Sequence, residues 1–194
     1  MPAVCILDDF EVHKNEEFLK IAEELKPELI TTQVKPVRLL YKENPGEGFS
    51  DKKNVKEEEP SLLSGKVLKK DDRVVLDFGD HQVGYVTLDL ASTGSHQDAP
   101  LYLYLRFAER IEELDSDPAE YNGWISKSWL QQEHIHVDVL PARLELPRRY
   151  AFRYMEINVI DVSMKFSLVI NDVTLKAVSA VSQDDVEPLA MDDP

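Results

Sequence analysis

Hydrophobic and polar residues alternate with a period of two through most of the chain between Lys66 and Ser182. Successive side chains of an extended strand point to opposite faces, so this alternation predicts strands that bury one face. The alternating apolar positions are Val86, Leu88 and Leu90; Leu101, Leu103, Leu105 and Phe107; Ile135, Val137 and Val139; Met155, Ile157 and Val159; Met164, Phe166, Leu168 and Ile170; and Val173, Leu175 and Ala177. Turn signals at Thr93-Gly94-Ser95 and Asn171-Asp172 separate these segments. Many short strands without a long helix between them predict an all-β fold, an antiparallel β-sandwich or jelly roll.

A different pattern marks residues 1–41, which we interpret as a short N-terminal extension that contains a helix. The helix is predicted from about Asn15 to Lys26, because two glutamates favour its first turn and Pro27 would end it. Its apolar stripe consists of Phe18, Leu19, Ala22 and Leu25. A short strand is expected around Val37 to Tyr41.

The stretch 42–65 is charged, punctuated by glycine and proline, and offers almost nothing to bury. It predicts a charged linker, a loop or disordered segment that separates the extension from a β-sandwich over 66–182. Residues 183–194 form an acidic tail without a closing element. The chain therefore looks cut at this tail.

Composition excludes several classes of protein. The 194-residue chain has a formal net charge of -15, and nucleic-acid partners require clustered Lys and Arg, which are absent from it. Its single cysteine, Cys5, allows no internal disulfide. No segment resembles a signal peptide or approaches the ~18 apolar residues of a membrane span. We expect a cytoplasmic protein with no membrane partner.

Three short segments carry a family resemblance. They are Asp77-Phe78-Gly79 with Val83-Gly84-Tyr85, then Leu105-Arg106-Phe107-Ala108-Glu109, and finally Phe152-Arg153-Tyr154-Met155-Glu156. In this order and spacing they resemble the concanavalin-like β-sandwich of bacterial α-L-rhamnosidases, the N-terminal, non-catalytic region of glycoside hydrolase family 78. The chain departs from the family pattern over Gln131 to Val139, and at Ala151, where the family usually has glycine.

The resemblance implies an accessory domain rather than an enzyme. In the family an (α/α)₆ barrel that carries the catalytic acid and base follows the sandwich. The resemblance therefore implies that the acidic tail over 183–194 leads into a catalytic domain that this chain does not contain, and no catalytic residue can be assigned here. The expected function is to pack against that barrel in a parent glycoside hydrolase, without a cofactor. Asp77 and Glu109 belong to the resembling segments, but a backbone or arginine partner, Arg106 or Arg153, is the simpler role for both.

Aromatic residues suggest an alternative function in carbohydrate binding. Tyr121, Asn122, Trp124 and Trp129 lie close together in the sequence, with Gln131 and Gln132 nearby. Aromatic faces stack on sugars and amides bond to hydroxyl groups, so these residues are the candidate carbohydrate site. Two tryptophans in a domain of this size are more commonly core or interface anchors.

Tyr102, Tyr104 and Arg106 alternate with the leucines of one predicted strand and therefore share its opposite face. Tyrosine and arginine are enriched in protein interfaces. We interpret these three residues as the interface with the catalytic barrel, or as a face covered by the N-terminal helix.

Two polar clusters have residue types that bind metals. His134, His136 and Asp138 would share one face of a strand, and Asp115, Asp117 and Glu120 could offer oxygen atoms to calcium. The first cluster lacks a second group of ligands, and the second fails the spacing of a calcium loop. We favour solvent-facing roles for both clusters and predict no metal.

Overall fold

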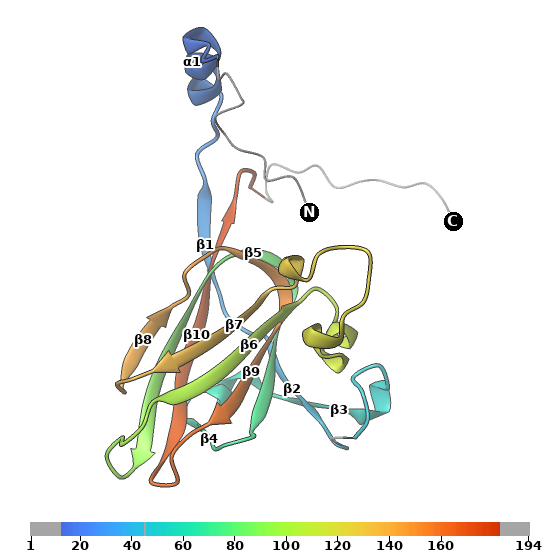
Figure 1. The fold of residues 1–194 in the computed structure, drawn as a ribbon, viewed down its shortest axis with the longest axis vertical. Coiled ribbons are helices and arrows are strands. Elements are labelled where there is room, and N and C mark those ends of the chain that lie inside the picture. The colour runs from blue at the N-terminus through green and yellow to red at the C-terminus, as the bar shows by residue number, and fades with distance from the viewer. Residues whose placement is uncertain (1–12, 45, 183–194) are drawn as a thin grey trace, which may run out of the picture. The chain divides into compact units, whose positions relative to one another are not determined.

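The computed structural model describes residues 13–44 and 46–182 of the chain (Figure 1). The predicted acidic tail over 183–194 and Cys5 lie outside the described residues. The chain divides into two units, residues 1–30 with 180–194 and residues 31–179. None of the described helices is long and apolar enough to cross a membrane.

The first unit contains helix α1, Glu16–Glu24, which confirms the predicted helix. Asn15 caps it, because its side-chain oxygen accepts a hydrogen bond from the backbone N–H of Phe18 at 3.1 Å. Every described residue of α1 is exposed, including the apolar stripe from Phe18 to Leu25. The helix is therefore formed by its cap and sequence pattern rather than by burial.

The second unit is an antiparallel β-structure with short 3₁₀ turns. Its strands are β1 (Ile30–Val34), β2 (Arg38–Lys42), β3 (Val55–Glu58), β4 (Lys66–Leu68), β5 (Arg73–Gly94), β6 (Leu101–Ala108), β7 (Gln132–Val137), β8 (Ala142–Glu145), β9 (Tyr150–Asp161) and β10 (Phe166–Ser179). The 3₁₀ turns are η2 (Lys52–Asn54), η3 (Pro60–Leu63), η4 (Ile111–Asp115), η5 (Pro118–Glu120) and η6 (Lys127–Trp129). The strands follow the order β1-β10-β5-β9-β6-β7, while β2, β4 and β8 pair beside this path.

Strand β5 links the two layers of the sandwich. Its first part pairs with β2 and β9, and its last part pairs with β8 and β10. The register against β9 shifts between Asp77 and Gln82, where Gly79 adopts a φ of 84°. A left-handed glycine bends the chain here without ending the strand, so β5 continues as one long strand through the bend.

Strand β10 contains a similar irregularity in place of a predicted turn. Its register against β5 shifts between Ile170 and Asp172, so Asn171 is the extra residue of a β-bulge. The bulge explains why the apolar alternation changes phase between Ile170 and Val173. Val139 and Met164 were predicted to continue buried strands and are instead exposed, because both lie outside strands.

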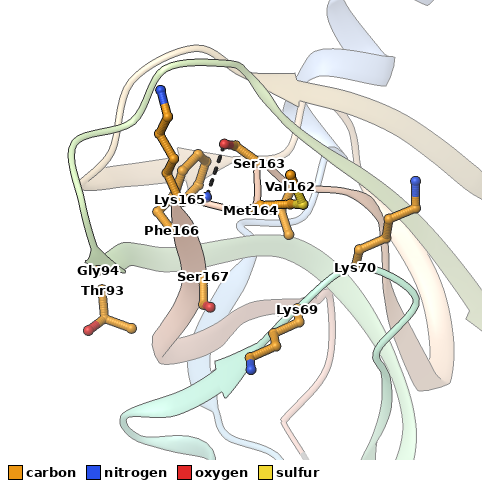
Figure 2. Close-up of a pocket in the computed structure, with 10 residues that line it drawn as sticks. All are labelled: Lys69, Lys70, Thr93, Gly94, Val162, Ser163, Met164, Lys165, Phe166 and Ser167. Carbon is orange, nitrogen blue, oxygen red and sulfur yellow. Dashed lines mark hydrogen bonds between the residues drawn. The ribbon is translucent and has the colours of Figure 1, made fainter.

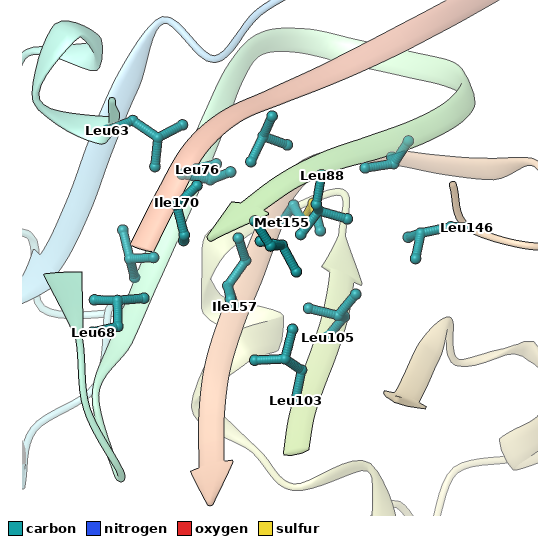
Figure 3. Packing of buried hydrophobic residues seen from close by; sticks show 14 of the residues in the cluster. Leu63, Leu68, Leu76, Leu88, Leu103, Leu105, Leu146, Met155, Ile157 and Ile170 are labelled. Atoms are coloured by element: carbon teal, nitrogen blue, oxygen red, sulfur yellow. The ribbon is translucent and has the colours of Figure 1, made fainter. Parts of the chain in front are cut away.

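The core lies between the layers and confirms the sandwich prediction. Figure 3 shows Leu76 and Leu88 of β5 close to Met155 and Ile157 of β9 and to Leu105 of β6. An aromatic group continues the core, in which Phe107 stacks on Tyr150 with 4.1 Å between ring centroids and Phe152 contacts Phe107 and Phe78 edge-on. Burial of this apolar surface is the main source of stability.

The predicted linker over 42–65 was wrong, because this stretch belongs to the sandwich. Strand β3 pairs with β2, and Phe49 and Leu63 are buried. The Asn54 side chain is buried too, and its oxygen accepts a hydrogen bond from the backbone N–H of Asn44 at 2.6 Å. The charged sequence of β3 concealed a strand that is held by backbone hydrogen bonds.

Candidate functional site

Asp77, from the first family-like segment, is fully buried between arginines of two neighbouring strands. Its Oδ1 accepts a hydrogen bond from Arg153 Nε at 2.9 Å, and its Oδ2 accepts one from Arg38 Nε at 3.1 Å. Burial by itself raises the pKa of this carboxyl. The hydrogen bonds from Arg153, from the Gly79 N–H and from Arg38 outweigh burial and hold the pKa below its usual value. Asp77 is therefore an ionised structural group, with its lone pairs engaged.

Glu156, from the third segment, forms a second buried cluster. Arg73 Nε lies 3.1 Å from its Oε1, and Arg106 Nη1 lies 3.4 Å from its Oε2. Burial raises the pKa of Glu156, and the two arginines offset this only in part. With no exposed surface, Glu156 cannot reach a substrate in this conformation.

Arg106 is buried, so it offers almost no surface to the interface that the sequence interpretation assigned to it. It is only 6% exposed, and its Nη2 donates to the carbonyl oxygens of Glu113 at 3.0 Å and Ser116 at 2.7 Å. Its Nη1 also donates to the carbonyl oxygen of Leu114 at 3.2 Å. The guanidinium group thus holds the segment that follows β6. Its positive charge can be buried because the three carbonyl groups and Glu156 replace the water molecules that would otherwise surround it.

The two tyrosines predicted to share that interface pair instead with histidines of the neighbouring strand β7. Tyr102 stacks on His136 with 4.1 Å between ring centroids, and Tyr104 stacks on His134 at 4.3 Å. Tyr102 Oη also lies 2.9 Å from His134 Nδ1. These four rings are half-buried or exposed and form a cross-strand ladder that joins β6 to β7.

The candidate metal ligands either lie apart from one another or already bond to other groups of the protein. Asp115 accepts hydrogen bonds from the backbone N–H groups of Phe49 at 2.6 Å and Ser50 at 2.9 Å, and pairs with Lys42 Nζ at 2.9 Å. Asp117 caps the next 3₁₀ turn through the N–H of Ala119. Among the described residues, no three His, Cys, Asp or Glu side chains are grouped to hold a metal ion.

Glu109 was expected to have a backbone or arginine partner. It is exposed, and its Oε1 lies 3.4 Å from His81 Nε2. The arginine alternative was therefore wrong for Glu109, whereas Arg153 was correctly expected as a partner of Asp77. The exposed pair contributes little to stability.

The long connection from β6 to β7 carries the aromatic candidates and borders a cavity of about 640 Å³. Tyr121 and Trp129 line this cavity, together with Pro118, Ile125 and Leu130. Asn122 and Trp124 do not line it. The structure thus brings together two of the four predicted carbohydrate-binding residues and leaves Trp124 projecting with 96% of its surface exposed.

A second cavity, of about 500 Å³, lies beside the turn between β9 and β10 (Figure 2). Lys69, Lys70 and Lys165 border it and point in different directions, with the exposed Met164 between them. Lys70 pairs with Asp161 at 3.1 Å and Lys165 with Asp98 at 2.7 Å. The three lysines of this cavity do not converge on one point. We therefore place the candidate functional surface at the connection from β6 to β7, which carries the aromatic residues.

A known protein family matches the sandwich that contains these buried clusters. The family model for the N-terminal domain of glycosyl hydrolase family 78 α-rhamnosidases matches residues 36–177. The chain belongs to this family. The match begins just before β2 and ends within β10, so the family domain includes residues 42–65, which the sequence interpretation had assigned to a linker.

One solved structure supports the family 78 assignment. A rhamnosidase from Klebsiella oxytoca with rhamnose bound is 35% identical, with a TM-score of 0.76, and the match covers 87% of this chain and 33% of that chain. The chain thus spans about a third of the length of that rhamnosidase. A family 78 rhamnosidase from Bacillus sp. GL1 matches at 16% identity and a TM-score of 0.40, covering 60% of this chain and 11% of that one. An α-L-rhamnosidase from Dictyoglumus thermophilum matches at 18% identity and 0.40, covering 79% and 13%. No curated protein matches the chain.

Sequence reasoning missed the cations that complete the buried clusters of this family 78 domain. Arg38 falls in the short strand expected around Val37 to Tyr41 and Lys42 in the predicted linker, but neither was assigned a carboxylate partner, and Arg73 was not singled out. The available signal was β2 itself, Arg38–Lys42, where apolar residues lie between two cations. A strand that buries its leucines can direct its cations toward carboxylates of the neighbouring strand.

Proposed function

We propose that the chain is a non-catalytic domain of an α-L-rhamnosidase-like glycoside hydrolase and that it packs against the helical barrel that performs the hydrolysis. One observation carries the proposal: the match spans 87% of this chain but only a third of the Klebsiella oxytoca rhamnosidase. Two thirds of that enzyme therefore lie outside the matched region. The resemblance implies that the acid and base belong to such a second domain.

The state of the buried carboxylates supports a non-catalytic role. A glycosidase needs one carboxylic acid and one carboxylate on either side of a bound sugar. Asp77 and Glu156, the fully buried carboxylates of the family-like segments, are each held by two arginines. Both contribute to the integrity of the sandwich and have no surface open to a substrate.

An activity assay tests the proposal directly. The purified chain is incubated with an aryl α-L-rhamnoside, and release of the phenol is followed by absorbance; we expect no hydrolysis above the uncatalysed rate. A family 78 catalytic domain serves as the positive control. Hydrolysis by this chain that survives removal of trace contaminants would overturn the non-catalytic role.

A further inference from the structure

The connection from β6 to β7 exposes two tryptophans within a few residues of each other. We refer to residues 121–130 as the aromatic loop; it lies in the yellow part of the ribbon in Figure 1. Trp124 is 96% exposed and Trp129 is 75% exposed. Tryptophan has a large apolar surface and is highly buried on average, so two exposed tryptophans in one short loop indicate a surface that a partner covers.

The aromatic loop is anchored at both ends, so its tryptophans have a defined support. On the entry side, the buried Arg106 binds the carbonyl groups that precede the loop. On the exit side, the Gln131 side chain donates to the carbonyl of Ala151 at 2.8 Å and accepts from its N–H at 2.9 Å. Within the loop, the Tyr121 ring lies directly against Gly123. An anchored surface loses less conformational entropy on binding.

Polar groups around the neighbouring cavity are largely engaged inside the domain. Arg106 and Gln131 make the bonds described above, and Glu113 accepts from the backbone N–H groups of Glu109 and Arg110. Asp117 caps its own turn. A sugar site requires free donors and acceptors that converge on hydroxyl groups. What this cavity offers instead is the apolar surface of Pro118, Tyr121, Ile125, Trp129 and Leu130.

Charge around the aromatic loop indicates the chemistry of the partner. Glu109, Asp117 and Glu120 line the cavity beside the apolar surface, and Arg110 and Lys127 are cations close to them in the sequence. Arg110 is paired with Glu112 at 3.4 Å, and Lys127 donates to the carbonyl of Ala119. The excess of carboxylates favours a partner face that is apolar at its centre and basic at its rim, since complementary charge raises the association rate and selects the partner.

We propose that the aromatic loop is the docking surface of this domain for the catalytic domain of an α-L-rhamnosidase, with Trp124 and Trp129 as the anchors. The inference rests on the proposed function and identifies the surface through which it operates. Interface energy concentrates in a few central side chains, and tryptophan is the most enriched of them. Tyr102 and Tyr104, the earlier interface candidates, stack on histidines of β7 and lie outside the aromatic loop.

Binding of the 194-residue chain to a purified family 78 catalytic domain, whose fold is verified by circular dichroism, tests the proposal. Calorimetry gives the affinity, and tryptophan emission reports burial of the loop. We expect Trp124→Ala and Trp129→Ala each to weaken binding about tenfold or more. Trp124→Phe, which keeps an aromatic ring, should lose less. Met164→Ala removes an equally exposed apolar side chain outside the loop and should bind as the wild type does.

Charge provides a second readout. Glu120→Gln removes a rim carboxylate and should slow association and flatten the dependence of the association rate on salt, with little change in the dissociation rate.

The possible outcomes distinguish the docking surface from the proposed function. If the wild-type chain binds but both tryptophan variants bind equally well, the docking surface is wrong and the proposed function stands. If the wild-type chain does not bind, the packing role itself is overturned. If L-rhamnose alone changes the tryptophan emission and Trp129→Ala abolishes that change, the loop is a sugar site and the docking proposal is overturned.

Discussion

Asp77 of β5 and Arg153 of β9 are joined by a hydrogen bond of 2.9 Å, although 76 positions separate them in the sequence. Both residues belong to the segments that resemble family 78, and Arg38 of β2 completes the cluster from the other side. Three strands thus converge on one buried carboxylate at the bend of β5. These segments therefore help to hold the sandwich together at this point.

Asp77→Asn should destabilise the domain substantially. The substitution keeps the shape of the side chain but removes the buried charge that both arginines share. Removing one partner of a buried pair costs about 3–5 kcal/mol, and we expect about 2–3 kcal/mol here because both arginines are partly exposed and can reach water. Urea unfolding at neutral pH measures the change.

Glu57→Gln is the matched control for Asp77→Asn. Glu57 pairs with the same Arg38, at 3.5 Å, but is exposed, so its loss should change the free energy of unfolding by less than about 0.5 kcal/mol. Equal urea midpoints for Asp77→Asn and the wild type would show that the cluster does not stabilise the fold.

Arg106→Lys should loosen the start of the β6–β7 connection. Lysine keeps the charge but cannot bond at once to Glu156 and to the carbonyl groups of Glu113 and Ser116. We expect a loss of about 2 kcal/mol, because buried hydrogen bonds to a charged group contribute about 1.5–3 kcal/mol. Hydrogen exchange should accelerate in residues 110–118. Arg110→Lys alters an exposed arginine of the same segment and should leave exchange there unchanged; equal acceleration in both variants would contradict the assigned role.

Much of the sandwich could be predicted from sequence, because strands such as β6 and β9 bury apolar residues at alternate positions over much of their length. Other features depend on partners distant in the chain. The burial of Arg106 follows from Glu156, and the pairing of β3 follows from backbone groups of β2. Local composition carries no signal for either. The separation of Trp124 from the cavity beside Trp129 likewise depends on the fold of the loop.

Gly84→Ala should disturb the pairing of β5 with β10. A Cβ atom at Gly84 would lie 2.2 Å from the carbonyl oxygen of Lys176 and 2.8 Å from the Cα of Ala177. These are backbone atoms of the paired strand, so the strands must separate, at an expected cost of about 1–3 kcal/mol. Gly46→Ala is the control, because no heavy atom lies within 4 Å of its added Cβ. Chemical denaturation compares the two variants, and equal stability would show that β10 can move aside freely.

Asp115 should make the stability of the domain dependent on acid pH. Burial raises the pKa of this carboxyl, but the hydrogen bonds from the Phe49 N–H, Lys42 and Ser50 lower it from 3.8 to about 2. A lowered folded-state pKa means that the ionised form stabilises the fold above pH 3.8 and that this contribution disappears as the pH falls toward 2. It amounts to about 2 kcal/mol at neutral pH.

Urea unfolding of the wild type and Asp115→Asn across this range measures the contribution. The difference in unfolding free energy between the two proteins should be largest above pH 4 and should shrink steadily between pH 4 and pH 2 as the wild-type carboxylate takes up its proton. Glu43→Gln removes an exposed carboxylate of the neighbouring segment and should change the free energy of unfolding only slightly. A difference for Asp115→Asn that stays constant down to pH 2 would mean that the side chain stabilises the loop over residues 48–50 by shape and neutral hydrogen bonds, and that its charge contributes nothing.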